Sequence, residues 1–372
     1  MKLKIKRDSF FASFQLAAAV APSRSPKPIL QNIKIECTED KTTLTATDME
    51  VGVRMEVADV EVEAAGAAII PVSRLSLILR ESTDDELVID ADSERTIITG
   101  QNCRFELQGQ NPDEFPMINE FNSESYFEVS SNVFRELIKR TLFATDAESS
   151  RYALGGVLLE FEEAKIIAVG TDGRRLAKME GVINAVGDPG TGGQTTIVPA
   201  KSMQLMDRIL PSGEEPVKVA TQQNDLVVKQ ENVVFSTRLV EGRFPKWRDV
   251  IPTRQDSTKI DIPVGQMHSA LRQAAIVASE ESRGIDFTFK QGSLVLSNST
   301  ADVGQSRIEM PVPYDDSEMT ITLDHRFVAD FLKVLEPDNN FTLDIEDGES
   351  AAYCRSGESY GYVIMPLSRD RN

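Results

Sequence analysis

A long internal repeat is the feature that most limits how this chain can fold. Residues 44–53 (LTATDMEVGV) and 169–177 (VGTDGRRLA) each carry an apolar run that breaks at Thr-Asp, and residues 294–304 (LVLSNSTADVG) keep the run but blur the turn. The stretches 68–72 (AIIPV), 196–200 (TIVPA) and 321–324 (ITLD) recur in the same way, as do Phe115-Pro116 and Phe244-Pro245. A period of about 125 residues matches the usual size of a domain. We therefore predict three repeats with boundaries near Ser123 and Thr253, at residues 1–123, 124–253 and 254–372.

Each repeat follows one pattern, in which a short strand leads into a helix and further strands flank a second helix. Strands are predicted at residues 2–6, 29–37, 42–46, 52–57, 86–90, 96–99, 104–108 and 126–129. Helices are predicted at residues 8–20 and 72–80, 132–143 and 200–210, and 264–279 and 325–335, with Asp8 and Ser9 as N-cap candidates for the first. Asp172-Gly173 predicts a tight turn between two strands. The predicted fold class is α+β, with two helices packed on antiparallel sheets in each repeat.

The charge of the chain is unevenly distributed. Its net charge of −19 argues against a nucleic-acid partner. The six predicted helices have the opposite bias, with 10 Lys/Arg against 4 Asp/Glu. Mixed charges on a helix often indicate only that one face is exposed to solvent. This basic bias, however, recurs in equivalent elements of three repeats. We therefore predict one shared basic surface formed by the helices.

Cysteine and histidine are too scarce to suggest a metal or catalytic centre. The three cysteines, Cys37, Cys103 and Cys354, lack CxxC spacing, which favours free thiols in a reducing cytosol over disulfides or metal binding. The two histidines, His268 and His325, lie far apart in the sequence, which leaves little material for a zinc site or a His-based triad. Residues 187–194 (GDPGTGGQ) are Gly-rich but lack the Lys-Ser/Thr of a phosphate loop, so they predict a hairpin loop. No metal or cofactor is expected.

The N-terminal residues allow two interpretations. Residues 1–21 combine basic, apolar and small side chains in the order of a secretory signal. Residues 1–6, however, alternate apolar and charged side chains, and Gln15 interrupts the apolar run that follows, so a strand and a helix are favoured. No other stretch approaches the roughly 18 apolar residues of a membrane span.

Several uncommon strings occur in one order along the chain, namely residues 28–30 (PIL), 151–156 (RYALGG), 169–173 (VGTDG), 239–245 (LVEGRFP) and 362–366 (YVIMP). Together with the three repeats they resemble the β subunit of bacterial DNA polymerase III, the sliding clamp family, over the whole length of the chain. The resemblance implies a non-enzymatic protein of three clamp domains per chain, which forms a head-to-tail homodimeric ring around duplex DNA with helices lining the hole. It also implies a cytoplasmic, nucleoid-associated location, and as partners the replicative DNA polymerase, the clamp loader and other proteins with a clamp-binding motif.

A ring would also reconcile the negative net charge of the chain with DNA binding. The basic helices would face the phosphates, while the acidic exterior would repel DNA. Twelve helices spaced about 10 Å apart lie on a circle about 38 Å across, and subtracting one helix diameter of about 10 Å leaves a hole of about 28 Å, enough for a duplex and a water layer. Contacts to phosphate carry no sequence information, which permits sliding. The DNA-binding positions that the resemblance implies are Arg24, Arg80, Arg135, Lys139, Arg140, Arg151, Tyr152 and Lys201. The family often has a second aromatic residue after the tyrosine, where this chain has Ala153.

In this family a groove between the second and third domains recruits partners. The matching residues are Leu154, Thr171, Gly173, Arg174, Arg175, Leu176, Pro245, Val250, Val363, Met365, Pro366 and Leu367. Apolar side chains left at a surface would form a slot for a partner peptide, and we expect both 171–176 and 363–367 to offer them. The alternative is plain core packing, which fits Val363 best. The chain departs from the family pattern at Arg174, where a His is familiar, and in its extension at residues 368–372.

The ring seam in the family joins the first domain of one chain to the third domain of the other. The residues that match it are Phe105 and Leu107 on an edge strand, and Ile276 and Val277 near a helix end. Ordinary core packing is the alternative for all four.

Two other functions are weighed against the clamp. Asp48 and Asp172 could be catalytic carboxylates of a hydrolase, but they are repeat equivalents in different domains, and acid/base chemistry needs two groups in one pocket. A secreted or scaffold β-rich protein would require cleavage of the N-terminal residues.

Overall fold

The computed structural model describes residues 1–146, 152–190, 195–254, 257–279, 283–300 and 303–368, with Tyr152 described by its backbone only. By contacts the chain divides into two compact units. Unit 1 comprises Met1–Phe134, Ile183–Thr191 and Lys201–Leu239, and unit 2 comprises Arg135–Val182, Gly192–Ala200 and Val240–Asn372. No helix in the described ranges combines the length and apolar character that a membrane span needs.

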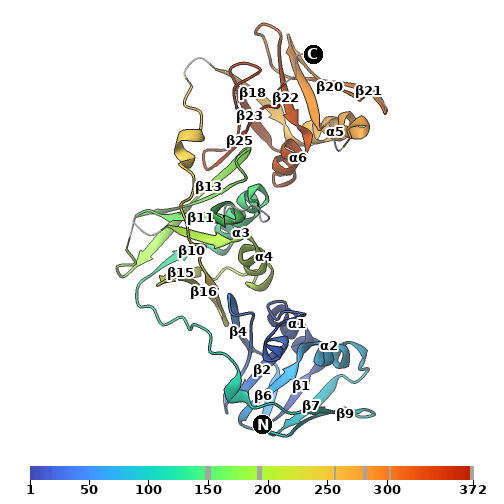
Figure 1. The fold of residues 1–372 in the computed structure, drawn as a ribbon, viewed down its shortest axis with the longest axis vertical. Helices are drawn as coiled ribbons and strands as arrows, with labels where there is room; N and C mark the ends of the chain where they lie inside the picture. The colour runs from blue at the N-terminus through green and yellow to red at the C-terminus, as the bar shows by residue number, and fades with distance from the viewer. Residues whose placement is uncertain (147–151, 191–194, 255–256, 280–282, 301–302, 369–372) are drawn as a thin grey trace. The chain divides into compact units, whose positions relative to one another are not determined.

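Unit 1 contains two antiparallel sheets. The five-stranded sheet has the order β5-β1-β7-β8-β9, from β1 (Lys2–Lys6), β5 (Val60–Ala64), β7 (Glu86–Ala91), β8 (Arg95–Thr99) and β9 (Arg104–Gln108). The other has the order β10-β15-β16-β17-β4-β3-β2-β6, from β2 (Asn32–Cys37), β3 (Thr42–Thr47), β4 (Val51–Val57), β6 (Gly66–Pro71), β10 (Tyr126–Val129), β15 (Val217–Gln222), β16 (Asp225–Gln230) and β17 (Val233–Arg238). The helices α1 (Arg7–Ala18) and α2 (Val72–Glu81) lie side by side against these strands, and α4 (Ala200–Ile209) follows later in the chain (Figure 1). Side chains such as Phe10, Phe14, Leu75 and Leu79 are buried beneath the first two helices.

Unit 2 also contains two antiparallel sheets. One has the order β18-β23-β24-β25-β13-β12-β11-β14, from β11 (Gly156–Phe161), β12 (Lys165–Thr171), β13 (Arg175–Val186), β14 (Thr196–Pro199), β18 (Thr258–Pro263), β23 (Asn340–Ile345), β24 (Ala352–Ser356) and β25 (Tyr360–Ile364). The four-stranded sheet has the order β21-β20-β19-β22, from β19 (Gly284–Lys290), β20 (Ser293–Thr300), β21 (Gly304–Pro311) and β22 (Met319–Asp324). The helices α5 (Val264–Ala274) and α6 (His325–Lys333) pack together (Figure 1). The remaining helix, α3 (Ser131–Thr141), lies mostly in this unit.

Short 3-10 turns connect several of these elements. They are η1 (Pro28–Gln31), η2 (Pro112–Glu114), η3 (Leu142–Ala144), η4 (Tyr152–Gly155), η5 (Trp247–Val250) and η6 (Ala275–Val277). Two of them shorten predicted helices, since α3 ends before η3 and α5 ends before η6.

The six predicted helices and the α+β class are confirmed, but the predicted N-cap of the first helix is wrong. The helix begins at Arg7, directly after β1, and its N-cap position, Lys6, provides no side-chain cap. Ser9 instead donates to Asp59 (3.2 Å), and the Arg7 guanidinium donates to the Ser82 carbonyl (2.7 Å). The stretch that resembles a secretory signal therefore forms an interior strand and a packed helix of unit 1. The prediction also missed β5 and β6.

Candidate functional site

A tight turn after β12 forms one part of the candidate site. The Thr171 hydroxyl donates to the Arg175 carbonyl (2.6 Å) and accepts from the Gly173 N–H (3.1 Å). Asp172 Oδ1 accepts from the backbone N–H groups of Arg174 (2.9 Å) and Arg175 (3.0 Å). Gly173 has a φ of +87°, a region that Gly adopts without strain. The Thr-Asp-Gly sequence thus explains the predicted turn through its own hydrogen bonds.

The first repeat forms the same turn with the same atoms. The Thr47 hydroxyl donates to the Val51 carbonyl (2.7 Å) and accepts from the Met49 N–H (3.0 Å). Asp48 Oδ1 accepts from the N–H groups of Glu50 (3.0 Å) and Val51 (2.8 Å), and Met49 takes a φ of +80°. The same hydrogen bonds form in both repeats although the other side chains of the turn differ. Formation of the turn therefore explains why Thr and Asp occupy these positions in both repeats. This role explains Asp48 and Asp172 without the carboxylate chemistry of a hydrolase.

Each turn leads into a strand that pairs with the last strand of the next repeat. In unit 2, β13 pairs with β25 in a register that places Leu176 opposite Val363. The Met365 N–H then donates to the Arg174 carbonyl (2.9 Å). The structure therefore brings residues 171–176 and 363–367 together, as the predicted partner site requires.

An apolar cluster lies beneath this strand pair. Its buried members are Ala153, Leu158, Ile167, Val169, Leu176, Ile197, Trp247 and Val363, and the partly buried side chains packed against them are Val240, Phe244, Ile251, Ala351 and Tyr353. Sequence reasoning missed Trp247, Phe244 and Tyr353 as part of this surface. The signal for the first two was present, because the Phe-Pro pair of the repeat marks the loop that carries them.

The expectation that both stretches offer apolar side chains at the surface is wrong for several residues. Leu176 is 2% exposed and Val363 is 1% exposed, because β13 and β25 are interior strands whose inward side chains the cluster covers. Leu154 and Thr171 are buried as well. The exposed apolar side chains are Val250 (41%), Met365 (45%) and Leu367 (37%), beside exposed Pro245 and half-buried Pro366.

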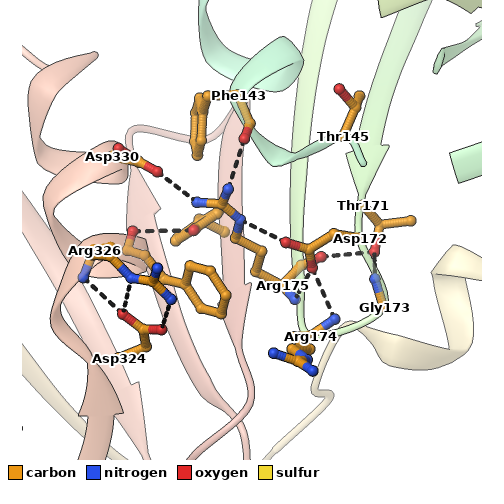
Figure 2. Close-up of polar contacts among 12 residues, drawn as sticks. Phe143, Thr145, Thr171, Asp172, Gly173, Arg174, Arg175, Asp324, Arg326 and Asp330 are labelled. Atoms are coloured by element: carbon orange, nitrogen blue, oxygen red, sulfur yellow. Dashed lines mark hydrogen bonds and ion pairs between the residues drawn. The ribbon is translucent and has the colours of Figure 1, made fainter. Parts of the chain in front are cut away.

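Arg175 is held by several contacts within this chain (Figure 2). Its guanidinium donates to Asp172 (3.0 Å), to Asp330 on α6 (2.8 Å) and to the Phe143 carbonyl (2.8 Å), and it lies 4.4 Å from the centre of the Phe327 ring. Burial alone would lower the pKa of Arg175, but Tyr362 and the Asp330 hydrogen bond outweigh that effect and raise it. Only 10% of the side chain is exposed. Arg175 therefore joins the turn to α6, and its contact with a partner stays a prediction.

The predicted DNA-binding residues are not equally available. Arg24, Arg80, Lys139 and Lys201 are exposed, and Lys201 forms an ion pair with Asp48 (2.6 Å). Arg135 is half-buried. Arg140 is only 20% exposed, pairs with Glu136 (2.5 Å) and lies 5.1 Å from the centre of the Tyr360 ring, and its contact with DNA stays a prediction. Arg151 and the side chain of Tyr152 lie outside the described residues.

A regular cation pattern on the helices was missed by sequence reasoning. Five of the six α-helices carry an exposed Lys or Arg at their ninth residue, whereas α1 has Gln15 there; the five are Arg80, Lys139, Arg208, Arg272 and Lys333. Each of these cations lies in the last turn of its helix, where it also complements the helix dipole. Aligning the helices by their first residues would have revealed the pattern.

The predicted seam residues lie at surfaces. The strand β9 is at the edge of its sheet, with Phe105 37% exposed and Leu107 half-buried. Ile276 in η6 is 76% exposed, and Val277 is half-buried. Core packing therefore does not account for Phe105 and Ile276. Their role in a dimer stays a prediction.

Within the described ranges, no group of three or more His, Cys, Asp or Glu side chains could hold a metal ion. The three cysteines are free, with Cys37 and Cys354 buried. Burial raises the pKa of the Cys354 thiol to about 12, which makes it inert at neutral pH.

Comparison with known proteins covers the whole chain. Family models of the DNA polymerase III beta subunit match in three parts, the N-terminal domain at residues 1–119, the central domain at residues 128–246 and the C-terminal domain at residues 248–368. The chain is 31% identical over 369 residues to the beta sliding clamp of Chlamydia muridarum (strain MoPn / Nigg), which covers 99% of both proteins. It is 26% identical over 370 residues to the beta sliding clamp of Escherichia coli (strain K12), which covers 99% of this chain and 100% of that one.

Solved structures agree in fold. The DNA polymerase sliding clamp from Bacillus subtilis superimposes with a TM-score of 0.92 at 22% identity, over 99% of each chain. The DnaN sliding clamp from Pseudomonas aeruginosa bound to griselimycin gives a TM-score of 0.92 at 25% identity, over 99% of this chain and 100% of that chain. With three family domains in order and relatives matched end to end, this chain belongs to the DNA polymerase III beta subunit family, the bacterial sliding clamps.

Proposed function

We propose that this protein is a processivity factor that encircles duplex DNA and tethers the replicative polymerase and other partners to it. Two copies close head to tail into a ring, with the edge strand β9 of one copy and the η6 region of the other at each seam. Exposed Phe105 and Ile276 support this arrangement, because isolated apolar side chains at a strand edge and a helix end suit a contact that closes by rotation.

The observation that carries the proposal is the cation at the ninth residue of five helices. In a chain of net charge −19, five exposed cations at one repeated helix position would together provide a basic surface for phosphates, whose contacts carry no sequence information. Such contacts hold DNA weakly and without sequence preference, so the topology of the ring supplies the retention. A protein with this role works in the bacterial cytoplasm with the nucleoid, together with a clamp loader that opens the ring.

The partner site is the apolar cluster with its exposed rim. We propose that the exposed side chains of Val250, Met365 and Leu367 make up this rim, and that the ligand is a short peptide with a Gln and paired Leu/Phe anchors. Methionine adapts its shape to different ligands, which suits a site that serves several partners in turn. A crystal structure of a related clamp bound to griselimycin supports the ability of this fold to hold a ligand.

Salt dependence of duplex binding tests the basic surface. Changing Arg208, Arg272 and Lys333 to Gln should reduce the slope of log affinity against log salt by about one unit for each phosphate that no longer has a cation beside it. The matched control changes Lys41, Arg95 and Lys259 to Gln, three exposed cations outside the helices, and should leave the slope unchanged. Equal effects of the two triple variants would contradict a DNA surface formed by the helices.

A further inference from the structure

Several arginines near the turn and the apolar cluster are paired with carboxylates of the same chain. Arg175, Arg248 and Arg326 each form such pairs, with Asp172 and Asp330, with Glu160 and Glu162, and with Asp324, respectively. The nearby acids are used as well, since Asp330 also accepts from Lys333 (3.2 Å). These arginines and acids are therefore engaged within the chain.

Arg174 is the exception at the turn. Its backbone is fixed on both sides, because its N–H donates to Asp172 (2.9 Å) and its carbonyl accepts from the Met365 N–H (2.9 Å). Its side chain is exposed and, within the described part of the chain, makes no hydrogen bond, ion pair or ring contact. Figure 2 shows its guanidinium outside the network that holds Arg175. Arg174 thus presents an unpaired guanidinium from a hydrogen-bonded backbone, beside the exposed side chain of Met365.

The first repeat shows what a side chain at this position can reach. Glu50 is the equivalent of Arg174 in the matching turn, and its carbonyl accepts from the Arg238 N–H (2.9 Å) as the Arg174 carbonyl accepts from Met365. There the two side chains form an ion pair, with Glu50 Oε1 3.7 Å from the Arg238 guanidinium. In the second turn the same two positions hold Arg174 and Met365, so the cation has no acid across from it. A ligand carboxylate that lies over Met365 would fill the place of that missing charge.

We propose that Arg174 is a specificity-determining residue, which selects partner segments that carry an Asp or Glu beside their apolar anchors. The inference rests on the proposed function, because that function supplies the peptide-binding site. The apolar anchors would lie on the exposed rim at Met365, Leu367 and Val250, and the carboxylate would pair with the guanidinium at the turn. An exposed ion pair is worth only a modest preference, about two- to fivefold in affinity, and salt should weaken it.

Peptide titration against the full-length protein tests this inference. The probes are synthetic peptides that share a Gln and paired Leu/Phe anchors and carry one Glu, or the uncharged Gln of similar shape, at each flanking position in turn. The wild-type protein should bind at least one Glu peptide two- to fivefold more tightly than its Gln counterpart. Arg174→Ala should bring the ratio of Glu-peptide to Gln-peptide affinity to about one, whatever its effect on the affinity that the two peptides share. Arg174→Glu should transfer the preference to the matching Lys peptide.

Arg243→Ala is the matched control, since Arg243 is an exposed arginine next to Phe244 of the cluster and its removal changes the net charge equally. It should keep the preference for the Glu peptide. The inference is overturned if the wild-type protein does not discriminate, or if Arg243→Ala removes as much preference as Arg174→Ala, because a long-range field would then be responsible. Binding of all peptides without discrimination would refute only the role of Arg174. Failure of every peptide to bind would refute the proposed partner site and this inference with it.

Discussion

At the scale of single residues, Asp324 illustrates how one carboxylate can fix a helix start. It is 4% exposed and accepts from the Arg326 N–H at the start of α6 (3.0 Å) and from the Arg326 guanidinium (3.0 and 2.6 Å). Burial by itself raises the pKa of this carboxyl, but the hydrogen bonds from Arg326 outweigh burial and lower it. The contribution of Asp324 to folding stability is therefore present at neutral pH.

That contribution has a defined pH dependence. Because the folded pKa lies below the unfolded value, it should decline as the pH falls below about 4 and vanish once the pH passes the folded pKa. Asp324→Asn keeps a capping side chain and removes the charge, so it should lower the unfolding free energy at pH 7 by about 1 kcal/mol. Urea unfolding at pH 7 and at pH 3 measures this, and the difference between the two proteins should shrink at pH 3. An equal difference at both values would contradict the assignment.

Burial also separates two residues that the sequence placed in one site. Leu176→Asp puts an unpaired carboxylate into the buried cluster and should destabilise the fold by about 3 kcal/mol. Met365→Ala alters an exposed side chain and should leave the melting temperature nearly unchanged while weakening peptide binding about tenfold, as loss of an interface anchor does. Calorimetric melting and peptide titration of both variants check this. Tight peptide binding by Met365→Ala would exclude Met365 from the site.

At the scale of elements, the contact between Arg175 and Asp330 can be compared with the equivalent positions one repeat earlier. The equivalents of Arg175 and Asp330 in the previous repeat are Val51 and Leu205, so a charged pair replaces an apolar one. The turn forms in both repeats, so it does not need the arginine. Arg175 instead ties β13 to α6 and to the end of η3 within unit 2.

A double-mutant cycle tests that role. Arg175→Val or Asp330→Leu alone leaves a charge without its main partner and should cost about 3 kcal/mol of unfolding free energy. The double variant copies the apolar residues found at the equivalent positions one repeat earlier, Val51 and Leu205, and should recover most of that loss. If Arg175 acts by holding the junction, peptide affinity should recover as well. Recovered stability with peptide affinity still lost would show that Arg175 contacts the ligand directly.

The sequence predicted elements better than it predicted side-chain environments. Repetition and apolar periodicity identified all six helices, because both patterns are local. The N-cap at Asp8 failed because Lys6 ends one hydrogen-bonded element and Arg7 begins the next, which no side-chain preference reveals. Leu176 is buried in a cluster with Trp247, and Arg175 donates a hydrogen bond to Asp330. Both partners are distant in the sequence. The positions of the site residues could therefore be matched to a family, but their solvent exposure could not be predicted from the sequence.

At the scale of the whole molecule, the account depends on closure of a ring. The exposed apolar residues Phe105 and Ile276, the recurring helix cations and the exposed rim at Met365 each have a place in such a ring. A ring retains DNA by topology, so retention should depend on the shape of the DNA and not on its sequence. This dependence separates a clamp from an ordinary DNA-binding protein, which dissociates from circular and linear duplexes alike.

Retention on DNA before and after linearisation tests whether the protein closes into a ring. The protein would be assembled on a nicked circular plasmid with a clamp loader, separated from free protein by gel filtration at moderate salt, and then treated with an enzyme that cuts the plasmid once. We predict that the protein stays on the circle and is released on cutting, and that Ile276→Asp/Val277→Asp is folded but not retained. Equal retention on circular and linear DNA, or equal retention of the seam variant, would contradict the account.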